Sequence, residues 1–304
     1  MKGARHLWRG RLALAATVVI WSTPPLFQFW LAASYDAWTQ NFYRYAAGFL
    51  TMAPFLLWMA WRTPRRLPLH EWLGCAWAAI PNVVHQVAQT MAVVLLLPGI
   101  YALFGRVSVI FTALLAVIFF ADERWIARSF KFFTGTLLGL VGVAGLVAAP
   151  GGTWPWAGLA LAFLAAAGWA SYGIFVKKFT ARSGPTLGFG VISFFTSLLL
   201  LPLMLWFGDA TQFLRADAWT NFVLLGSGVV AIGLGHWLYY IGIRELGAAP
   251  AQSALLLCPL GTMLLSAGFF GETFGVGQIL AGAVLLLGAF LALSARPPIV
   301  EEPA

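Results

Sequence analysis

One arginine, Arg106, stands in the middle of an apolar stretch that is about as long as a lipid bilayer is thick. The stretch runs from Leu95 to Phe120 and contains no acidic residue. An arginine at the centre of a membrane helix costs at least about 2.5 kcal/mol, so its guanidinium should face a protein interior or a wet cavity. Two interpretations remain open: a structural arginine that binds backbone carbonyls or a helix end, and a residue that binds an anionic group.

Four polar residues share one face of the apolar segment that precedes this stretch. They are Asn82, His85, Gln86 and Gln89, whose spacing of three, four and seven puts them on one side of a helix. Polar side chains in a membrane helix are kept away from lipid. They either form hydrogen bonds between helices or line a wetted cavity, and four on one stripe favour the cavity.

A second group of candidate cavity residues is largely aromatic. One apolar segment carries His236, Tyr239 and Tyr240 within about one turn. A second segment carries Trp21 near its middle, and a third carries Trp169 and Tyr172 near its middle. Because histidine titrates near neutral pH, proton exchange at His85 or His236 is a further and less favoured hypothesis.

Arg44 is the other arginine within an apolar segment, and it lies near the end of that segment. It either extends its side chain to water or faces the cavity. The core of every predicted helix lacks Asp and Glu, whereas Asp122, Glu123 and Glu272 fall at helix ends, where we expect them to bind loop amides. Since arginine binds carboxylates and phosphates through paired N–H groups, two arginines without an acid favour an anionic ligand over a cation.

The composition defines the class of protein that must hold these residues. Of the 304 residues, 61% are hydrophobic and 9% are charged, whereas a soluble domain has about 25% charged residues. The net charge is +8, but the basic residues do not form a solvated basic domain that could bind nucleic acid. We therefore expect no nucleic-acid partner. Cys75 and Cys258 fall in apolar segments and are interpreted as packing residues. Motifs for metal binding, nucleotide binding and catalysis are absent, so we expect no cofactor, no ATP hydrolysis and no enzymatic activity.

The pattern predicts an all-α membrane protein with ten transmembrane helices. Each apolar segment is close to the roughly 20 residues needed to span a bilayer. The first is interpreted as an uncleaved membrane helix, because its apolar run continues beyond the length of a signal peptide. The segments are 11–31, 38–61, 71–94, 96–120, 131–149, 155–176, 186–207, 220–242, 248–270 and 275–295.

Basic residues predict the orientation of these spans. If the N-terminus is cytoplasmic and the spans alternate, the extracytoplasmic segments contain only Arg215, and both termini are cytoplasmic. The cytoplasmic segments then contain Lys2, Arg5, Arg9, Arg11, Arg62, Arg65, Arg66, Arg124, Arg128, Lys131, Lys177, Lys178, Arg182, Arg244 and Arg296.

The two halves of the chain, 1–150 and 151–304, show matching residues at an offset of about 150. Because each half has five spans, the second half must run opposite to the first, which predicts two inverted five-helix repeats around a central cavity. The matches are Trp21 with Trp169, Pro54 with Pro202, Trp58 with Trp206, His85 with His236, and Phe119–Glu123 with Phe269–Glu272, followed by a glycine-rich last helix in each half.

With these features the chain resembles the ten-helix, EamA-type members of the drug/metabolite transporter superfamily. The resemblance rests on Trp21-Ser22, on Trp169-Ala-Ser171, on Phe42-Tyr-Arg44, and on the stretch from Leu246 through Pro259 to Gly271-Glu272. It implies a basket of helices 1–4 and 6–9 around a cavity, with helices 5 and 10 at the periphery, and export or exchange of small metabolites by alternating access. Val109 stands where the repeat would put a proline opposite Pro259, so the first half is specialised.

We therefore expect a secondary transporter of a small polar metabolite, anionic or zwitterionic, such as an amino acid or an organic acid. The alternatives are an exporter of hydrophobic or cationic drug-like compounds and a membrane scaffold that uses the same fold without transport. The expected partners are the small-molecule substrate and the lipid bilayer, and the expected state is a monomer or weak homodimer. The expected location is the cytoplasmic (inner) membrane of a bacterium. The candidate substrate-binding residues are Arg106, His85, Gln86, Gln89, Asn82, His236, Tyr239, Tyr240, Trp21, Trp169, Tyr172 and Arg44.

Overall fold

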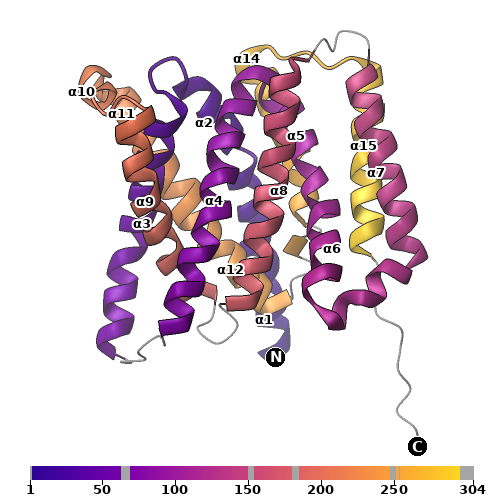
Figure 1. Cartoon of the computed structure of the whole chain (residues 1–304), viewed down its shortest axis with the longest axis horizontal. Helices are drawn as coiled ribbons and strands as arrows, with labels where there is room; N and C mark the ends of the chain where they lie inside the picture. Colours follow the sequence, from indigo (N-terminus) through magenta and orange to yellow (C-terminus); the bar gives the residue numbers. More distant parts are fainter. Residues whose placement is uncertain are drawn as a thin grey trace, which may run out of the picture.

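A computed structural model describes residues 2–62, 69–149, 154–179, 185–246, 251–252 and 254–294. Within these ranges the chain is helical and contains no strand. Figure 1 shows the long helices side by side, running between two ends of the molecule. The elements of the first half are α1 Lys2–Trp21, α2 Pro24–Leu31, α3 Ala37–Arg62, α4 Leu69–Leu96, α5 Pro98–Phe104, η1 Gly105–Val107, α6 Ser108–Phe119, η2 Ala121–Arg128 and α7 Phe130–Ala148. Those of the second half are α8 Trp156–Phe179, α9 Pro185–Phe207, α10 Gln212–Arg215, α11 Ala218–Ser227, η3 Gly228–Leu234, α12 Gly235–Leu246, η4 Leu255–Leu257, α14 Cys258–Phe270 and α15 Val276–Leu293.

All ten predicted apolar segments are mainly helical where the structure describes them. In the described part of the chain, eight helices are long and apolar enough to cross a membrane, and Leu255–Phe270 is a shorter apolar helix. The remaining segment, α3, has 26 residues but carries Gln40, Asn41 and Arg44. Large apolar side chains face outward, including Leu264, which is 77% exposed. Such a surface belongs in lipid, and the fold is that of an all-α membrane protein.

Four of the segments are interrupted rather than continuous, and in one of them, 248–270, the 3₁₀ turn η4 precedes α14. The first breaks after Trp21 and restarts at Pro24, as the Pro24-Pro25 pair predicts, because proline is suited to the first turn of a helix. The segment 96–120 consists of α5 and α6 joined by the 3₁₀ turn η1, and 220–242 consists of α11 and α12 joined by the π-helix η3. Such local departures from α geometry are frequent at functional sites.

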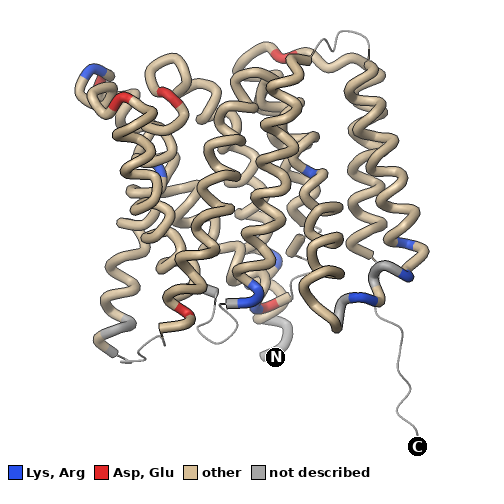
Figure 2. The backbone as a smooth tube through the Cα atoms, in the orientation of Figure 1, with Lys and Arg blue, Asp and Glu red and all other residues tan. Residues whose placement is uncertain are grey.

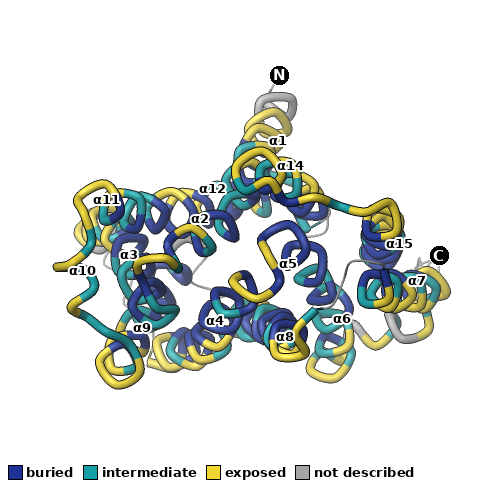
Figure 3. Tube along the Cα trace, turned by 90° about the horizontal axis from the view of Figure 1, so that it is seen from above, coloured by how far each residue is buried: buried dark blue, intermediate teal, exposed yellow. Residues whose placement is uncertain are grey.

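The helices pack in pairs that match between the two halves. Helix α4 packs against α8, and α1 packs against α12; the repeat offset maps the first pair onto the second. Figure 3 shows α7 and α15 side by side at one end of the molecule, beyond the helices that surround its middle. This is the peripheral position that the family resemblance implies for helices 5 and 10.

Glycines allow α7 and α15 to approach each other closely. A Cβ atom at Gly288 would lie 2.4 Å from the backbone nitrogen of Gly139, and one at Gly142 would lie 2.5 Å from that of Leu285. Small residues at one helix interface give close backbone packing in membranes, where the hydrophobic effect contributes little. The glycines that mark the last helix of each half therefore form the contact between these two helices.

The two ends of the molecule differ in their charged residues. In Figure 2, Lys and Arg gather at the end where α1 begins, and acidic residues mark the opposite end near α10 and α2. Of the charged residues considered in the sequence, Arg65, Arg66, Arg182 and Arg296 lie outside the described residues, as do the side chains of Lys2, Arg5, Arg62, Asp122 and Glu123.

Glu272 is a buried carboxylate that joins the two halves. It accepts hydrogen bonds from the backbone N–H groups of Gly99 at 2.9 Å and Ile100 at 3.3 Å, and from the hydroxyl of Ser266 at 2.5 Å. These amides belong to the first turn of α5, whose N–H groups have no partner within the helix. The sequence predicts that Glu272 binds loop amides at its own helix end; the carboxylate binds Ser266 there and also caps a helix of the other half.

Glu272→Ala is expected to lower the thermal unfolding temperature of the detergent-purified protein. The substitution leaves the amides of Gly99 and Ile100 buried and unpaired, at about 1–3 kcal/mol for each group. Glu272→Gln keeps one carbonyl acceptor and should lose less. Asp209→Ala, which removes an ion pair between the exposed side chains of Asp209 and Arg215, is the control and should change little. Equal unfolding temperatures for Glu272→Ala and the unmodified protein would show that the capping contributes nothing.

Candidate functional site

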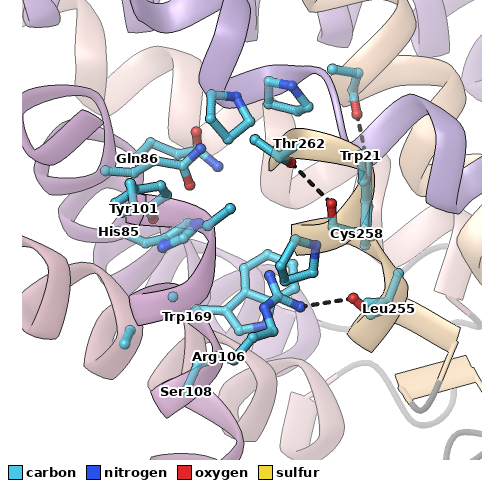
Figure 4. A pocket seen from close by; sticks show the side chains of 18 of the residues that line it. Trp21, His85, Gln86, Tyr101, Arg106, Ser108, Trp169, Leu255, Cys258 and Thr262 are labelled. Carbon is cyan, nitrogen blue, oxygen red and sulfur yellow. Dashed lines mark hydrogen bonds between the residues drawn. The ribbon is translucent and has the colours of Figure 1, made fainter. Parts of the chain in front are cut away.

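A cavity of about 110 Å³ lies between the halves of the molecule. It is large enough for several water molecules or a small solute. Figure 4 shows Arg106, His85, Gln86 and Trp169 around this space, facing Trp21, Cys258 and Thr262 across it. The sequence-predicted residues that line it are Trp21, Arg44, His85, Gln86, Gln89, Arg106, Trp169 and His236.

Arg106 lies in the 3₁₀ turn η1, between α5 and α6. Its Nη1 atom donates to the carbonyl of Leu255 at 3.2 Å, shown by a dashed line in Figure 4. Its Nε atom is buried without a hydrogen-bond partner in the structure. Leu255 begins the 3₁₀ turn η4, which the repeat offset of 150 maps onto η1. Both sequence interpretations thus have an observation behind them: one N–H group binds a backbone carbonyl, and another remains available to a ligand.

Arg44, on α3, is only 1% exposed. Its side chain therefore does not extend to water at the membrane surface. The alternative in which it reaches the membrane surface is therefore wrong, because α3 packs against α9 and η3 at this level. Its Nε donates to the hydroxyl of Ser227 at 3.1 Å, and its Nη1 is buried without a partner. Arg44 also lines the cavity, so a second unpaired N–H group belongs to this site.

The two histidines are held by backbone carbonyls. The Nδ1 of His85 lies 2.8 Å from the carbonyl of Ala165, and the Nδ1 of His236 lies 2.9 Å from that of Ile232. A carbonyl accepts only, so we assign the proton to Nδ1 in both rings, which leaves Nε2 as an acceptor when the ring is neutral. Gly168 permits the approach of α8 to His85, because a Cβ there would lie 2.9 Å from the His85 backbone nitrogen.

Aromatic rings form one wall of the cavity around Trp21. The ring centroid of Trp21 lies 4.8 Å from that of His236, 4.9 Å from that of Tyr239 and 6.0 Å from that of Trp169. Its indole N–H donates to the carbonyl of Ala231 in the π-helix at 3.0 Å. Gly235 leaves room for this contact, since a Cβ there would lie 2.4 Å from Trp21 Nε1. The indole is therefore fixed in position by η3.

Four predicted site residues do not line the cavity. Asn82 is buried in hydrogen bonds with Tyr45 and Thr196, because it lies one turn before His85, where α4 packs against α3 and α9. The hydroxyls of Tyr172 and Tyr240 lie 3.4 Å apart and bind each other. Tyr239 packs beside Trp21. Tyr172 follows Trp169 on α8 by about one turn, and Tyr239 and Tyr240 follow His236 on α12 by about one turn. The three tyrosines therefore lie next to residues that line the cavity.

Sequence reasoning missed most of the cavity residues that come from broken helices. Tyr101, Ser108 and Thr262 line the cavity, as do small or apolar residues such as Ala231 and Leu255. Tyr101 and Ser108 flank Arg106 within about one helical turn, and this spacing was the available signal. Cys258, interpreted as a packing residue, is buried and also lines the cavity.

Comparisons with known proteins gave a family match and a structural match. Residues 156–294 match the family described as the EamA-like transporter family. Among 27 matching chains of solved structures, one titled "Crystal structure of protein" shares 16% sequence identity at a TM-score of 0.65, covering 93% of this chain and 95% of that chain. At that identity the likeness concerns the fold alone. No curated protein sequence matches.

The apolar helices and the family match indicate a multi-pass membrane protein that contains a domain of a transporter family. The second half of the chain is an EamA domain of the drug/metabolite transporter superfamily, as the sequence resemblance indicates.

Proposed function

We propose that this protein is a secondary transporter that exports or exchanges a small anionic or zwitterionic metabolite, such as an organic acid or an amino acid, by alternating access. The observation that carries the proposal is the pair of arginines on one cavity, each with a buried N–H group that lacks a protein partner. Buried polar groups are normally satisfied, so these N–H groups are suited to a ligand or to water that a ligand replaces.

The absence of a carboxylate from the cavity argues against a cationic substrate. Among the described residues that line the cavity there is no Asp or Glu. A membrane carrier for cations ordinarily needs an intramembrane acid as counter-ion or proton carrier. The drug-exporter alternative is therefore less favoured than the anionic or zwitterionic one.

Alternating access requires two bundles that rock about a central site, and the proposed inverted repeat, 1–150 and 151–304, would supply them. Two observations support the repeat. The pair α4 and α8 is matched by the pair α12 and α1, and the turn η1 is matched by η4 at the same offset.

Uptake into proteoliposomes tests this function. The panel should contain monocarboxylates, dicarboxylates, amino acids and hydrophobic cations, with protein-free liposomes as the control. We expect saturable flux of at least one anion or zwitterion. Saturable flux of cations alone would favour a drug exporter, and a complete absence of flux would favour a scaffold.

The proposed location is the cytoplasmic membrane of a bacterium, with both termini in the cytoplasm. In a chain whose native cysteines are replaced, Asp209→Cys should react from outside the cell with an impermeant thiol reagent. Lys178→Cys should react only after the cells are opened, because Lys178 ends α8 at the basic end of the molecule and basic residues are retained in the cytoplasm. The reverse labelling pattern would contradict this topology.

A further inference from the structure

Two guanidinium groups share the cavity, and neither has a carboxylate partner among the residues that the structure describes. Ion pairs within the described residues include His6 with Glu245, Arg215 with Asp209, and Arg244 with Glu245, and these three involve exposed basic side chains. Arg44 binds a hydroxyl, and Arg106 binds a backbone carbonyl. An uncompensated buried charge is costly in a protein interior, so two such charges attract anions to this site.

The two arginines are fixed to different parts of the structure. Arg44 extends from α3 to Ser227 at the end of α11, whereas Arg106 extends from η1 to Leu255 in η4. Their unpaired atoms are Nη1 in Arg44 and Nε in Arg106. The site therefore offers two points of attachment for negative groups, each held by a different part of the structure.

Among the described residues, the other polar groups of the cavity include no carboxylate that would pair with a cationic end. The polar groups of α4 and α12 are the imidazoles of His85 and His236 and the amides of Gln86 and Gln89. Both imidazoles are oriented by backbone carbonyls through Nδ1. An ammonium group would find no carboxylate among the described cavity residues, so a zwitterion would leave one arginine without a counter-charge.

We propose, on the basis of the function proposed above, that the transported substrate is a small organic dianion whose two anionic groups are bound by Arg106 and by Arg44. Two attachment points held by different elements suit a dicarboxylate with its carboxylates at the two ends of a short carbon chain. A phosphate ester concentrates both charges at one end and leaves the other arginine unpaired.

Competition experiments in proteoliposomes test this proposal on the unmodified protein. Unlabelled compounds compete against uptake of the labelled anion found in the uptake panel. Pairs of equal chain length isolate the second charge: succinate against butyrate, and glutarate against valerate. Alanine represents zwitterions, and glycerol phosphate represents phosphate esters. We expect each dicarboxylate to compete at least tenfold better than its monocarboxylate, alanine and glycerol phosphate.

Arg44→Gln assigns the preference to this side chain. It should reduce the ratio of dicarboxylate to monocarboxylate affinity at least tenfold. Arg44→Lys keeps the charge without the planar fork and should retain part of the ratio. Arg215→Gln, which changes the exposed last residue of α10, is the matched control and should leave the ratio unchanged. Thermal unfolding of every variant identifies those that are misfolded, and the chain-length comparison does not depend on any variant.

The outcomes separate this proposal from the function on which it rests. Equal competition by succinate and butyrate, or better competition by alanine, would overturn the dianion while leaving an anion or zwitterion transporter. Better competition by glycerol phosphate would assign both charges to one phosphate and likewise overturn the dicarboxylate. An unchanged ratio in a folded Arg44→Gln protein would remove Arg44 from the site. Absence of saturable uptake for any anion would refute the transport function itself.

Discussion

Arg106→Gln is expected to weaken binding of the transported anion by at least tenfold. Arg106 lines the cavity, and its buried Nε has no partner in the structure. Breaking a buried, hydrogen-bonded charge pair typically costs about 2–5 kcal/mol, and tenfold in affinity corresponds to only about 1.4 kcal/mol. Binding of the anion to the purified protein, measured by calorimetry or by competition, gives the ratio directly.

Arg106→Lys distinguishes a binding role from a purely electrostatic one. Lysine keeps the positive charge but lacks the planar fork, so it should recover part of the affinity. Both variants lose the arginine's bond to the carbonyl of Leu255, and thermal unfolding reports that structural loss separately. Normal binding and transport by a folded Arg106→Gln protein would make Arg106 structural and remove the main support for an anionic substrate.

Gly228→Ala is expected to destabilise the protein strongly and to reduce transport. A Cβ atom at this position would lie 2.2 Å from the carbonyl oxygen of Arg44 and 2.9 Å from its Cα, so backbone must move. Inserting even one methyl group into a tightly packed core costs about 1–3 kcal/mol. The displacement would separate η3 from α3 and carry Ser227 away from Arg44.

Gly226→Ala is the matched control, because a Cβ atom at Gly226 meets nothing within 4 Å. The two glycines are two residues apart on the same stretch of helix, so differences between the variants report the contact with α3. We expect Gly226→Ala to unfold at the temperature of the unmodified protein. Similar unfolding temperatures for both variants would contradict close packing at Gly228.

The sequence carried enough information to predict the membrane class and the ten apolar segments. Polar residues in long apolar runs are few, and hiding them from lipid leaves little choice of direction. That constraint predicts one cavity for Arg106, His85, Gln86 and His236, and all four line the cavity of the structure. Pro24 and Pro25 likewise revealed the break in the first span through their fixed geometry.

Other features depend on contacts between distant segments, which periodicity does not encode. The π-helix η3 fixes Trp21 through the carbonyl of Ala231. No local pattern in residues 228–234 predicts a π-helix there. Asn82 shares the stripe of His85 and yet is satisfied by Tyr45 and Thr196 from two other helices. Glu272 caps α5 across the interface between the halves, although its position suggested a role in its own turn.

Counterflow in proteoliposomes tests the central proposal, carrier-type transport of an anion, most directly. Vesicles are loaded with the unlabelled substrate found in the uptake panel and diluted into a trace of the same labelled compound. A carrier that alternates its binding site between the two sides exchanges one molecule for another, so we predict transient accumulation of label above the outside concentration, greatly reduced by Arg106→Gln. Simple equilibration without such an overshoot, in the unmodified protein, would contradict alternating access.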